Sequence, residues 1–315
     1  MKEKRFVIMT DAGADYSPEI AEKYGLERQP KSMITWNDGS QREADIDWEN
    51  ITPNDFYFLM SNKKNNFSSS IPEASVIRER LTNYAKQGLD IIVLTIRSAM
   101  SGSYDEFYRI AFEVRKVYRD IKIAVIDTLR YGGAMTLLAI EASLYRKEGN
   151  DFDDTVEYLE ETKKHVHQIG TLDDLFFLAR KGRISRGKAF MGNLVGIKPM
   201  ADFNNESGMS EVIGSAKGYQ KFFKILPDYV LKTIGSYKDK VFVISHSFRD
   251  PQAKEMARII KARFNPEELI MLPLGQATGA NVGPGLAAVY YIGDAKVSPN
   301  CEKEREIINE LLLQK

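Results

Sequence analysis

The sequence predicts an α/β fold of two domains, with a parallel-sheet N-terminal domain and an α+β C-terminal domain. The chain has 315 residues, which is about twice a common single-domain length. Its first part alternates short apolar runs with amphipathic helical patterns, as βαβ units do. This pattern is interrupted at 149–151. We therefore expect domains at residues 1–150 and 151–297 and a C-terminal helical extension at 298–315.

The N-terminal domain is predicted to begin with a strand at residues 5–10 and a helix at 18–24. Ser17 is a suitable N-cap, Pro18 suits the first helical turn, and Gly25 suits the C-terminal cap. Residues 90–96 are apolar and β-branched, which is typical of a central parallel strand buried on both faces. The other expected elements are a weak strand at 31–36, helices at 72–88, 104–118 and 133–145, and a strand at 121–127.

The C-terminal domain is predicted to follow a helix at residues 153–164. The same periodicities give strands at 166–171, 241–245, 268–274 and 288–292, and helices at 174–180, 220–234, 251–264 and 302–313. Glycine density and turn residues predict loops at 181–192, 204–210 and 275–285.

Charge and cysteine content narrow the functional classes. The chain has 44 Lys and Arg against 44 Asp and Glu, and this zero net charge argues against binding nucleic acid or anionic membrane through bulk charge. A single cysteine, Cys301, gives no disulfide framework and fits a reducing compartment. The apolar run at 6–9 is too short for a signal peptide or a spanning helix. We therefore expect a cytoplasmic protein.

Common catalytic motifs are missing from the sequence. It has no dinucleotide-binding glycine motif after the first strand, no phosphate-binding P-loop, no nucleophile elbow and no zinc-protease motif. His165, His167 and His246 are the three histidines, so a three-histidine centre would need all of them. We predict no metal site, surface or interface positions for His165 and His167, and a structural role for His246.

Two polar loops follow predicted strands, at the edge where open parallel sheets bind ligands. The loop at 10–15 contains Asp11 and Asp15, which are an acid/base pair, metal ligands or, as we favour, turn and cap residues. In the second loop, Ser101 and Ser103 flank Gly102 at a helix start. Their hydroxyls and the free amides there suit a carboxylate or phosphate, although a capped helix explains them equally well.

Three further segments are open to two interpretations each. Ser69 and Ser70 precede a proline-initiated helix and either cap that helix or form part of a functional site. Residues 275–285 contain four glycines, which suggests backbone held close to a ligand or to a neighbouring strand. Residues 180–188 carry five positive charges, which suit either solvent or an acidic partner.

Taken in order, these loops resemble the DegV family, which includes the fatty-acid-binding subunits of bacterial fatty acid kinases. The resemblance covers about residues 6–293. The matching segments are TDAGAD at 10–15, SSIP at 69–72, SAMSGSY at 98–104, IDT at 126–128, TLDDLFFLARKGRIS at 171–185, GIKPM at 196–200 and GANVGPG at 279–285.

The resemblance implies a two-domain DegV-like fold with one long-chain fatty acid in a buried tunnel between the domains. It implies that the carboxylate is bound by Ser69, Ser70, Ser101, Gly102, Ser103 and Asn281. It also implies a domain-interface or partner-docking role for Arg183, Arg186 and Lys188. Two positions depart from the family pattern, because Ala12 stands where a serine is common and Asn281 where a histidine is common.

We therefore expect a non-catalytic carrier that buries a long-chain fatty acid and presents its carboxyl group to a fatty acid kinase for acyl-phosphate formation. The fatty acid is the expected ligand, and no cofactor is expected. The alternative is an enzyme that acts on a small anionic substrate through Asp11, Asp15 and Ser101. A third possibility is a protein-interaction module that uses residues 181–188 and the terminal helix.

Overall fold

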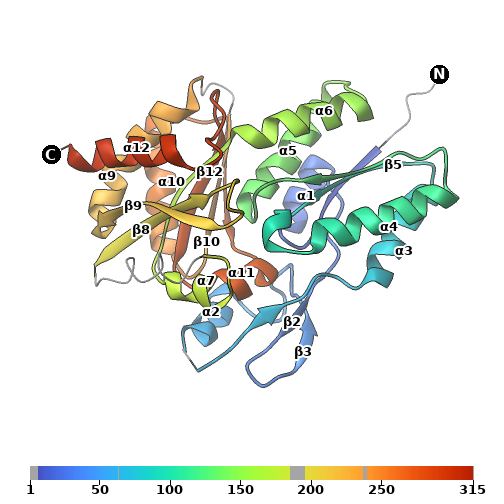
Figure 1. The fold of residues 1–315 in the computed structure, drawn as a ribbon, viewed down its shortest axis with the longest axis horizontal. Coiled ribbons are helices and arrows are strands. Elements are labelled where there is room, and N and C mark those ends of the chain that lie inside the picture. The colour runs from blue at the N-terminus through green and yellow to red at the C-terminus, as the bar shows by residue number, and fades with distance from the viewer. Residues whose placement is uncertain (1–5, 63, 185–195, 237–239, 315) are drawn as a thin grey trace. The chain divides into compact units, whose positions relative to one another are not determined.

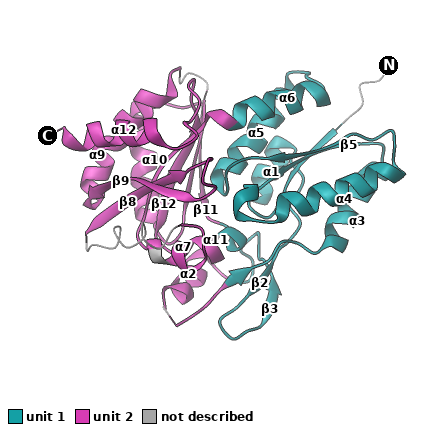
Figure 2. Cartoon of the chain, viewed as in Figure 1, with its two compact units in different colours: residues 1–50, 68–163, 275–278 teal, residues 51–67, 164–274, 279–315 magenta. Residues whose placement is uncertain are grey.

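The computed structural model describes residues 6–62, 64–184, 196–236 and 240–314. The chain divides into two compact units (Figure 2). Unit 1 comprises residues 1–50, 68–163 and 275–278, and unit 2 comprises residues 51–67, 164–274 and 279–315. Both units combine helices with a sheet, which confirms the predicted α/β class. The domain boundaries at 150 and 297 stay a prediction.

Unit 1 is built on three parallel strands in the order β1 (Phe6–Thr10), β5 (Asp90–Thr95) and β6 (Ile123–Asp127) (Figure 1). Every residue of β5 is buried, as its unbroken apolar sequence predicts. The helices of this unit are α1 (Pro18–Tyr24), α3 (Ala74–Lys86), α4 (Ser103–Val117), α5 (Gly133–Lys147) and α6 (Phe152–Thr162), with a 3₁₀ turn, η1, at Ser98–Met100.

The core of unit 1 lies between its sheet and two helices. Ile77 of α3 and Phe107 of α4 pack with Met9 and Val93 of the sheet. At the start of α1, the Ser17 hydroxyl accepts the Ile20 N–H, as predicted for an N-cap. A smaller antiparallel sheet has the order β3 (Gln41–Glu43), β2 (Met33–Thr35) and β4 (Ser68–Ser69). Only β2 was predicted, because β3 and β4 are too short to show a period.

Unit 2 contains a mixed four-stranded sheet in the order β11 (Glu268–Pro273), β10 (Val241–His246), β12 (Leu286–Ile292) and β7 (Val166–Leu172). The β10–β11 pair is parallel, while β12 runs antiparallel to both neighbours. Its helices include α7 (Leu175–Arg180), α9 (Gly218–Ile234) and α10 (Asp250–Phe264). This mixed sheet agrees with the α+β character expected from the sequence.

The terminal helix α12 (Glu302–Leu313) belongs to the core of unit 2. Ile308 and Leu311 are buried in that core. Arg305 pairs with Glu211 of β9 (Ser210–Lys217), and Lys232 of α9 pairs with Glu310. Because α12 supplies core side chains, it is not a loosely attached tail.

Several elements were not predicted. In unit 2, β8 (Ile197–Phe203) pairs with β9 around residues 204–209, of which the sequence indicated only the turn. A bulge between Met200 and Ala201 interrupts the alternation that would have revealed the hairpin. The helix α2 (Pro53–Ser61), capped by Thr52, was missed as well.

The expectation of a continuous loop at 275–285 was wrong, because α11 (Gln276–Val282) is helical. Gly279 lies inside this helix, and interior glycine disfavours a helix by roughly 1 kcal/mol relative to alanine. The glycine is required by packing. A Cβ atom there would lie 2.1 Å from the Tyr57 hydroxyl, which itself donates to the Leu274 carbonyl within the same unit.

Candidate functional site

The buried side chain of Asp11 organises the loop after β1. Its Oδ1 accepts the Gly13 N–H at 2.8 Å, and its Oδ2 accepts the Ile96 N–H at 2.9 Å. Oδ2 also accepts the Ser103 hydroxyl at 2.5 Å. Burial raises the pKa of Asp11, although the hydrogen bonds from Ser103, Ile96 and Gly13 act in the opposite direction. Both carboxylate oxygens of Asp11 therefore accept hydrogen bonds from groups of the protein itself.

Asp15 is occupied in a similar way within unit 1. Its Oδ1 accepts the Gly275 N–H at 2.8 Å, and its backbone N–H donates to the Thr136 hydroxyl. Thr278, three residues after Gly275, donates from its hydroxyl to the Gly13 carbonyl. The two carboxylates therefore fasten the loop after β1 to its neighbours. This favours the turn-and-cap interpretation over an acid/base pair.

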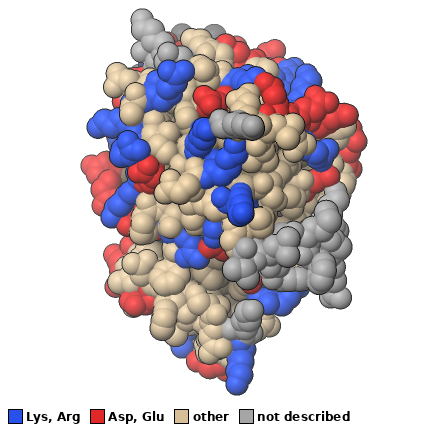
Figure 3. All heavy atoms as spheres, turned by 90° about the vertical axis from the view of Figure 1, so that its left-hand side faces the viewer, with Lys and Arg blue, Asp and Glu red and all other residues tan. Residues whose placement is uncertain are grey.

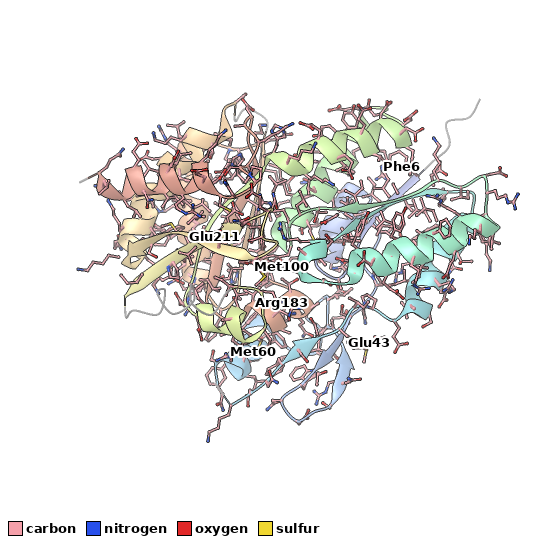
Figure 4. The ribbon with its side chains drawn as sticks, in the orientation of Figure 1. Phe6, Glu43, Met60, Met100, Arg183 and Glu211 are labelled. Atoms are coloured by element: carbon pink, nitrogen blue, oxygen red, sulfur yellow. The ribbon has the colours of Figure 1, made fainter. Side chains whose placement is uncertain are left out.

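The two serines of the loop after β5 have different surroundings. Ser103 is buried, and its hydroxyl proton is used by Asp11. Ser101 is half-buried, and its Oγ accepts the Ser103 N–H at 3.3 Å. The Ser101 oxygen thus has a lone pair engaged and keeps a proton to donate. Gly102, between them, is exposed, and a Cβ there would meet no atom within 4 Å. Met100, labelled in Figure 4, marks this loop in unit 1.

The serines before the proline helix also differ. Ser69 lies in β4, half-buried, and donates its hydroxyl proton to the Ala277 carbonyl at 2.8 Å. Ser70 is exposed, and its backbone N–H donates to the Met33 carbonyl at 3.0 Å. While the Ser69 bond persists, that hydroxyl can accept a further hydrogen bond but has no proton to donate to an anion.

Asn281 belongs to the part of α11 in unit 2 and is half-buried. The turn that follows it is held by Ser247, whose Oγ donates to the Gly283 carbonyl at 2.7 Å and accepts the Leu286 N–H at 3.0 Å. Asp173 lies against Gly285, and a Cβ added at Gly285 would lie 2.8 Å from the Cβ of Asp173. The glycines of this turn therefore allow close packing of backbone against protein.

A charged cluster surrounds Asp173 in unit 2. Lys198 Nζ lies 2.6 Å from Oδ1, Arg249 Nε lies 2.7 Å from Oδ2, and the Tyr219 hydroxyl donates to Oδ1 at 3.2 Å. Burial opposes ionisation of Asp173, but the contacts with Lys198 and Arg249 outweigh it and lower its pKa. No sequence pattern indicates this cluster, because its members come from β8, from α9, from the end of β7 and from the residue before α10.

The basic segment predicted as a docking surface is only partly described. Lys181 donates from Nζ to Asn66 Oδ1 at 2.9 Å and to the Phe67 carbonyl, within unit 2. Arg183, labelled in Figure 4, is half-buried and donates to the Lys181 carbonyl. Arg186 and Lys188 lie outside the described residues. Figure 3 shows the side that carries α9 and α12, where Lys and Arg side chains lie in the middle and also at the edges, there among Asp and Glu.

His165 and His167, expected at a surface or an interface, lie in packed surroundings, and a surface position for His167 is wrong because its side chain is 2% exposed. His167 is buried, stacks on Tyr291 with ring centroids 5.7 Å apart, and contacts the Ala295 carbonyl through Nε2 at 2.9 Å. His165 Nδ1 lies 3.1 Å from the Gly293 carbonyl.

Within the described ranges, no group of three His, Cys, Asp or Glu side chains is arranged to hold a metal ion. No helix in the same ranges is long and apolar enough to cross a bilayer.

Known proteins of one family are similar to this chain over almost its whole length. A family model described as uncharacterised protein, DegV family COG1307, matches residues 5–294. A DegV domain-containing protein from Clostridium perfringens is 30% identical over 295 residues, covering 93% of this chain and 99% of the relative.

Solved structures show the same fold at lower identity. A DegV lipid-binding protein from Thermotoga maritima superposes with a TM-score of 0.79 at 22% identity, covering 93% of this chain and 99% of that one. A DegV family protein from Eubacterium eligens, loaded with heptadecanoic acid, gives 0.79 at 18% identity, covering 92% and 100%. These likenesses confirm the predicted two-domain fold.

Proposed function

The chain belongs to the DegV family, and on that premise we propose that it is a non-catalytic fatty-acid carrier. It buries one long-chain fatty acid and presents the carboxyl group to a partner kinase, which converts it to an acyl phosphate. The Eubacterium eligens protein loaded with heptadecanoic acid supports a long-chain fatty acid as the ligand class. The carrier works in the cytoplasm and needs no cofactor.

The observation that carries the proposal is the state of the polar groups in unit 1. Asp11 and Asp15 are occupied by N–H and hydroxyl donors of the protein. Ser101 keeps a hydroxyl proton in a half-buried loop at the carboxyl edge of the parallel sheet. A site with a free donor and occupied acids suits binding an anion better than acid/base catalysis. In this proposal Ser69, Ser70, Gly102, Ser103 and Asn281 shape the rest of the head-group site.

Burial of the acyl chain supplies the affinity. A chain of about 14 methylenes, at about 0.8 kcal/mol each, offers roughly 11 kcal/mol before entropy costs. A few hydroxyl and amide donors then set the orientation of the carboxylate. Keeping the carboxyl group at a polar mouth lets the kinase transfer the γ-phosphoryl group of ATP to a carboxylate oxygen, with ADP released, while the chain stays out of water.

Lipid analysis of the purified protein tests the carrier function. We expect solvent extraction to release about one equivalent of fatty acid, and the delipidated protein to take up labelled oleate. Ser101→Ala is expected to weaken oleate binding, while Ser75→Ala, an exposed serine of α3, serves as the matched control. An empty protein that fails to take up oleate or palmitate would overturn the proposal.

The kinase step has its own test. The oleate-loaded protein is incubated with a fatty acid kinase catalytic subunit, ATP and hydroxylamine, which traps an acyl phosphate as the hydroxamate. We expect oleoyl hydroxamate only when carrier, kinase and ATP are all present. Arg183→Ala is expected to reduce the yield without changing oleate affinity. Hydroxamate formation from free oleate at the same rate without the carrier contradicts the presenting role.

A further inference from the structure

Gln276, the first residue of α11, has a side-chain orientation fixed by one hydrogen bond. Its Oε1 accepts the Asp45 backbone N–H at 2.9 Å, within unit 1. A backbone N–H can only donate, so the atom that faces it must be the carboxamide oxygen. The Asp45 carboxylate is itself engaged, because it accepts the N–H groups of Glu49 and Asn50. The Nε2 atom of Gln276 consequently points away from Asp45.

That Nε2 atom is buried without an acceptor. Gln276 is 2% exposed, and Nε2 has no hydrogen-bond partner among the residues that the structure describes. A buried amide donor without a partner is unfavourable, and proteins retain such a group where water or a ligand accepts from it. Nothing in the local sequence pattern distinguishes Gln276 from a surface glutamine, so the sequence alone does not indicate this donor.

Gln276 belongs to the same hydrogen-bonded assembly as the candidate head-group residues. The carbonyl of Ala277, the next residue, accepts the Ser69 hydroxyl. Thr278 donates to the Gly13 carbonyl, and the Gly13 N–H donates to Asp11. Asp11 in turn holds Ser103, whose N–H is accepted by Ser101. All these residues lie in unit 1.

Few side chains of this assembly have a proton left to donate to a ligand, and Gln276 is one of them. A carboxylate accepts hydrogen bonds and donates none, so its site must supply protons. The Ser69 proton is used by Ala277 and the Ser103 proton by Asp11. Ser101 keeps its proton, and Gln276 Nε2 is the second side-chain donor of the assembly that no described acceptor takes up.

We propose that Gln276 Nε2 donates a hydrogen bond to the carboxylate of the bound fatty acid and so helps the protein to select the acid over uncharged lipids of equal chain length. This inference rests on the proposed fatty-acid-binding function. It assigns to Gln276 a specificity role that adds to the serines.

The test compares oleate with oleyl alcohol, which share the chain and differ in head-group charge. Both displace a fluorescent fatty-acid analogue from the delipidated full-length protein. Gln276→Glu keeps an oxygen for the Asp45 N–H but replaces the donor with an acceptor. A hydrogen bond to a charged group corresponds to roughly ten- to hundredfold in affinity. We therefore expect oleate affinity to fall at least about tenfold and alcohol affinity to change less than about threefold.

Two further variants keep the test decisive. Gln29→Glu is the matched control, because Gln29 is 3% exposed in the same unit and its unpartnered atom is the acceptor Oε1. It introduces a similar buried charge, and we expect no loss of selectivity. Gln276→Met removes the donor without adding charge, and it should reduce the preference for oleate even if Gln276→Glu does not fold.

The outcomes separate this inference from the proposed function. Equal weakening of oleate and alcohol by both Gln276 variants, or the same loss of selectivity in Gln29→Glu, overturns it and leaves a trapped water as the partner of Nε2. A wild-type protein that binds neither lipid instead overturns the carrier function itself.

Discussion

The Ser103 hydroxyl donates a 2.5 Å hydrogen bond to Oδ2 of Asp11, across 92 positions of sequence. Both residues are buried, and the bond joins the loop after β1 to the first turn of α4. Ser101, only two positions earlier, is half-buried and receives the Ser103 N–H instead. Two hydroxyls of one loop therefore have different duties: the Ser103 hydroxyl stabilises the loop, and we propose that the Ser101 hydroxyl binds the ligand.

Substituting these serines separates the two duties. Ser103→Ala removes a donor from a buried carboxylate, and we expect it to lower the free energy of unfolding by about 1–3 kcal/mol. Ser101→Ala should lower it by less than about 1 kcal/mol, because only one long hydrogen bond is lost. Urea unfolding of both variants checks this, and oleate binding should show the opposite ranking. Equal destabilisation by the two substitutions contradicts the assignment.

The pKa of Asp11 makes a prediction about pH. Because burial raises the pKa of Asp11 in the folded protein, the folded state holds the proton more tightly than the unfolded chain does. The stability that protonated Asp11 contributes is therefore fully present below about pH 4, the ordinary value for the group, and is lost as the pH rises through the folded-state pKa. Asp11→Asn cannot titrate. Urea unfolding from pH 4 to pH 7 should show the wild-type advantage over this variant shrinking, and an advantage that grows contradicts it.

Asp173 should show the reverse dependence. Its pKa is lowered, because the contacts with Lys198 and Arg249 outweigh the effect of burial. Its stabilisation is present above about pH 4 and is lost as the pH falls through the lowered folded-state pKa. Asp173→Asn is expected to cost about 1–3 kcal/mol at pH 7, measured by urea unfolding, and less at pH 3. Glu255→Gln breaks an exposed pair with Arg258 and is the matched control, with little expected effect. A cost for Asp173→Asn that persists unchanged at pH 3 contradicts the ion-pair explanation.

Local features of the fold could be predicted from the sequence, whereas contacts between separate elements could not. Periodicity and caps correctly predicted local features such as the buried strand β5 and the Ser17 cap of α1. The sequence also indicated the loops that hold the candidate site. It could not show that Ser103 is used by Asp11, because that contact joins residues from separate elements.

The missed elements have physical causes of the same kind. The helix α11 contains Gly279, and an interior glycine disfavours a helix when the sequence is considered alone. A glycine is nevertheless needed at this position, because a Cβ would collide with Tyr57. The hairpin of β8 and β9 contains a bulge that breaks its alternation. The orphan Nε2 of Gln276 depends on the distant Asp45 N–H, so no local pattern reveals it.

The packing of α12 on β9 gives a prediction that decides whether the terminal helix is structural. A Cβ at Gly214 of β9 would lie 2.3 Å from Cγ2 of Ile308, which is fully buried. Gly214→Ala is expected to cost about 1–3 kcal/mol by overpacking. Ile308→Ala should cost about 2–5 kcal/mol through the lost side chain and the cavity.

Together the two substitutions are expected to cost less than the sum, because the shorter side chain makes room for the new methyl group. Gly102→Ala is the control for the chemical change, since a Cβ there meets no atom within 4 Å, and it should cost less than about 1 kcal/mol. Urea unfolding of the four proteins in the cycle measures the coupling. Strictly additive effects would mean that α12 does not rest on β9, and they would return the terminal helix to consideration as a partner-binding segment.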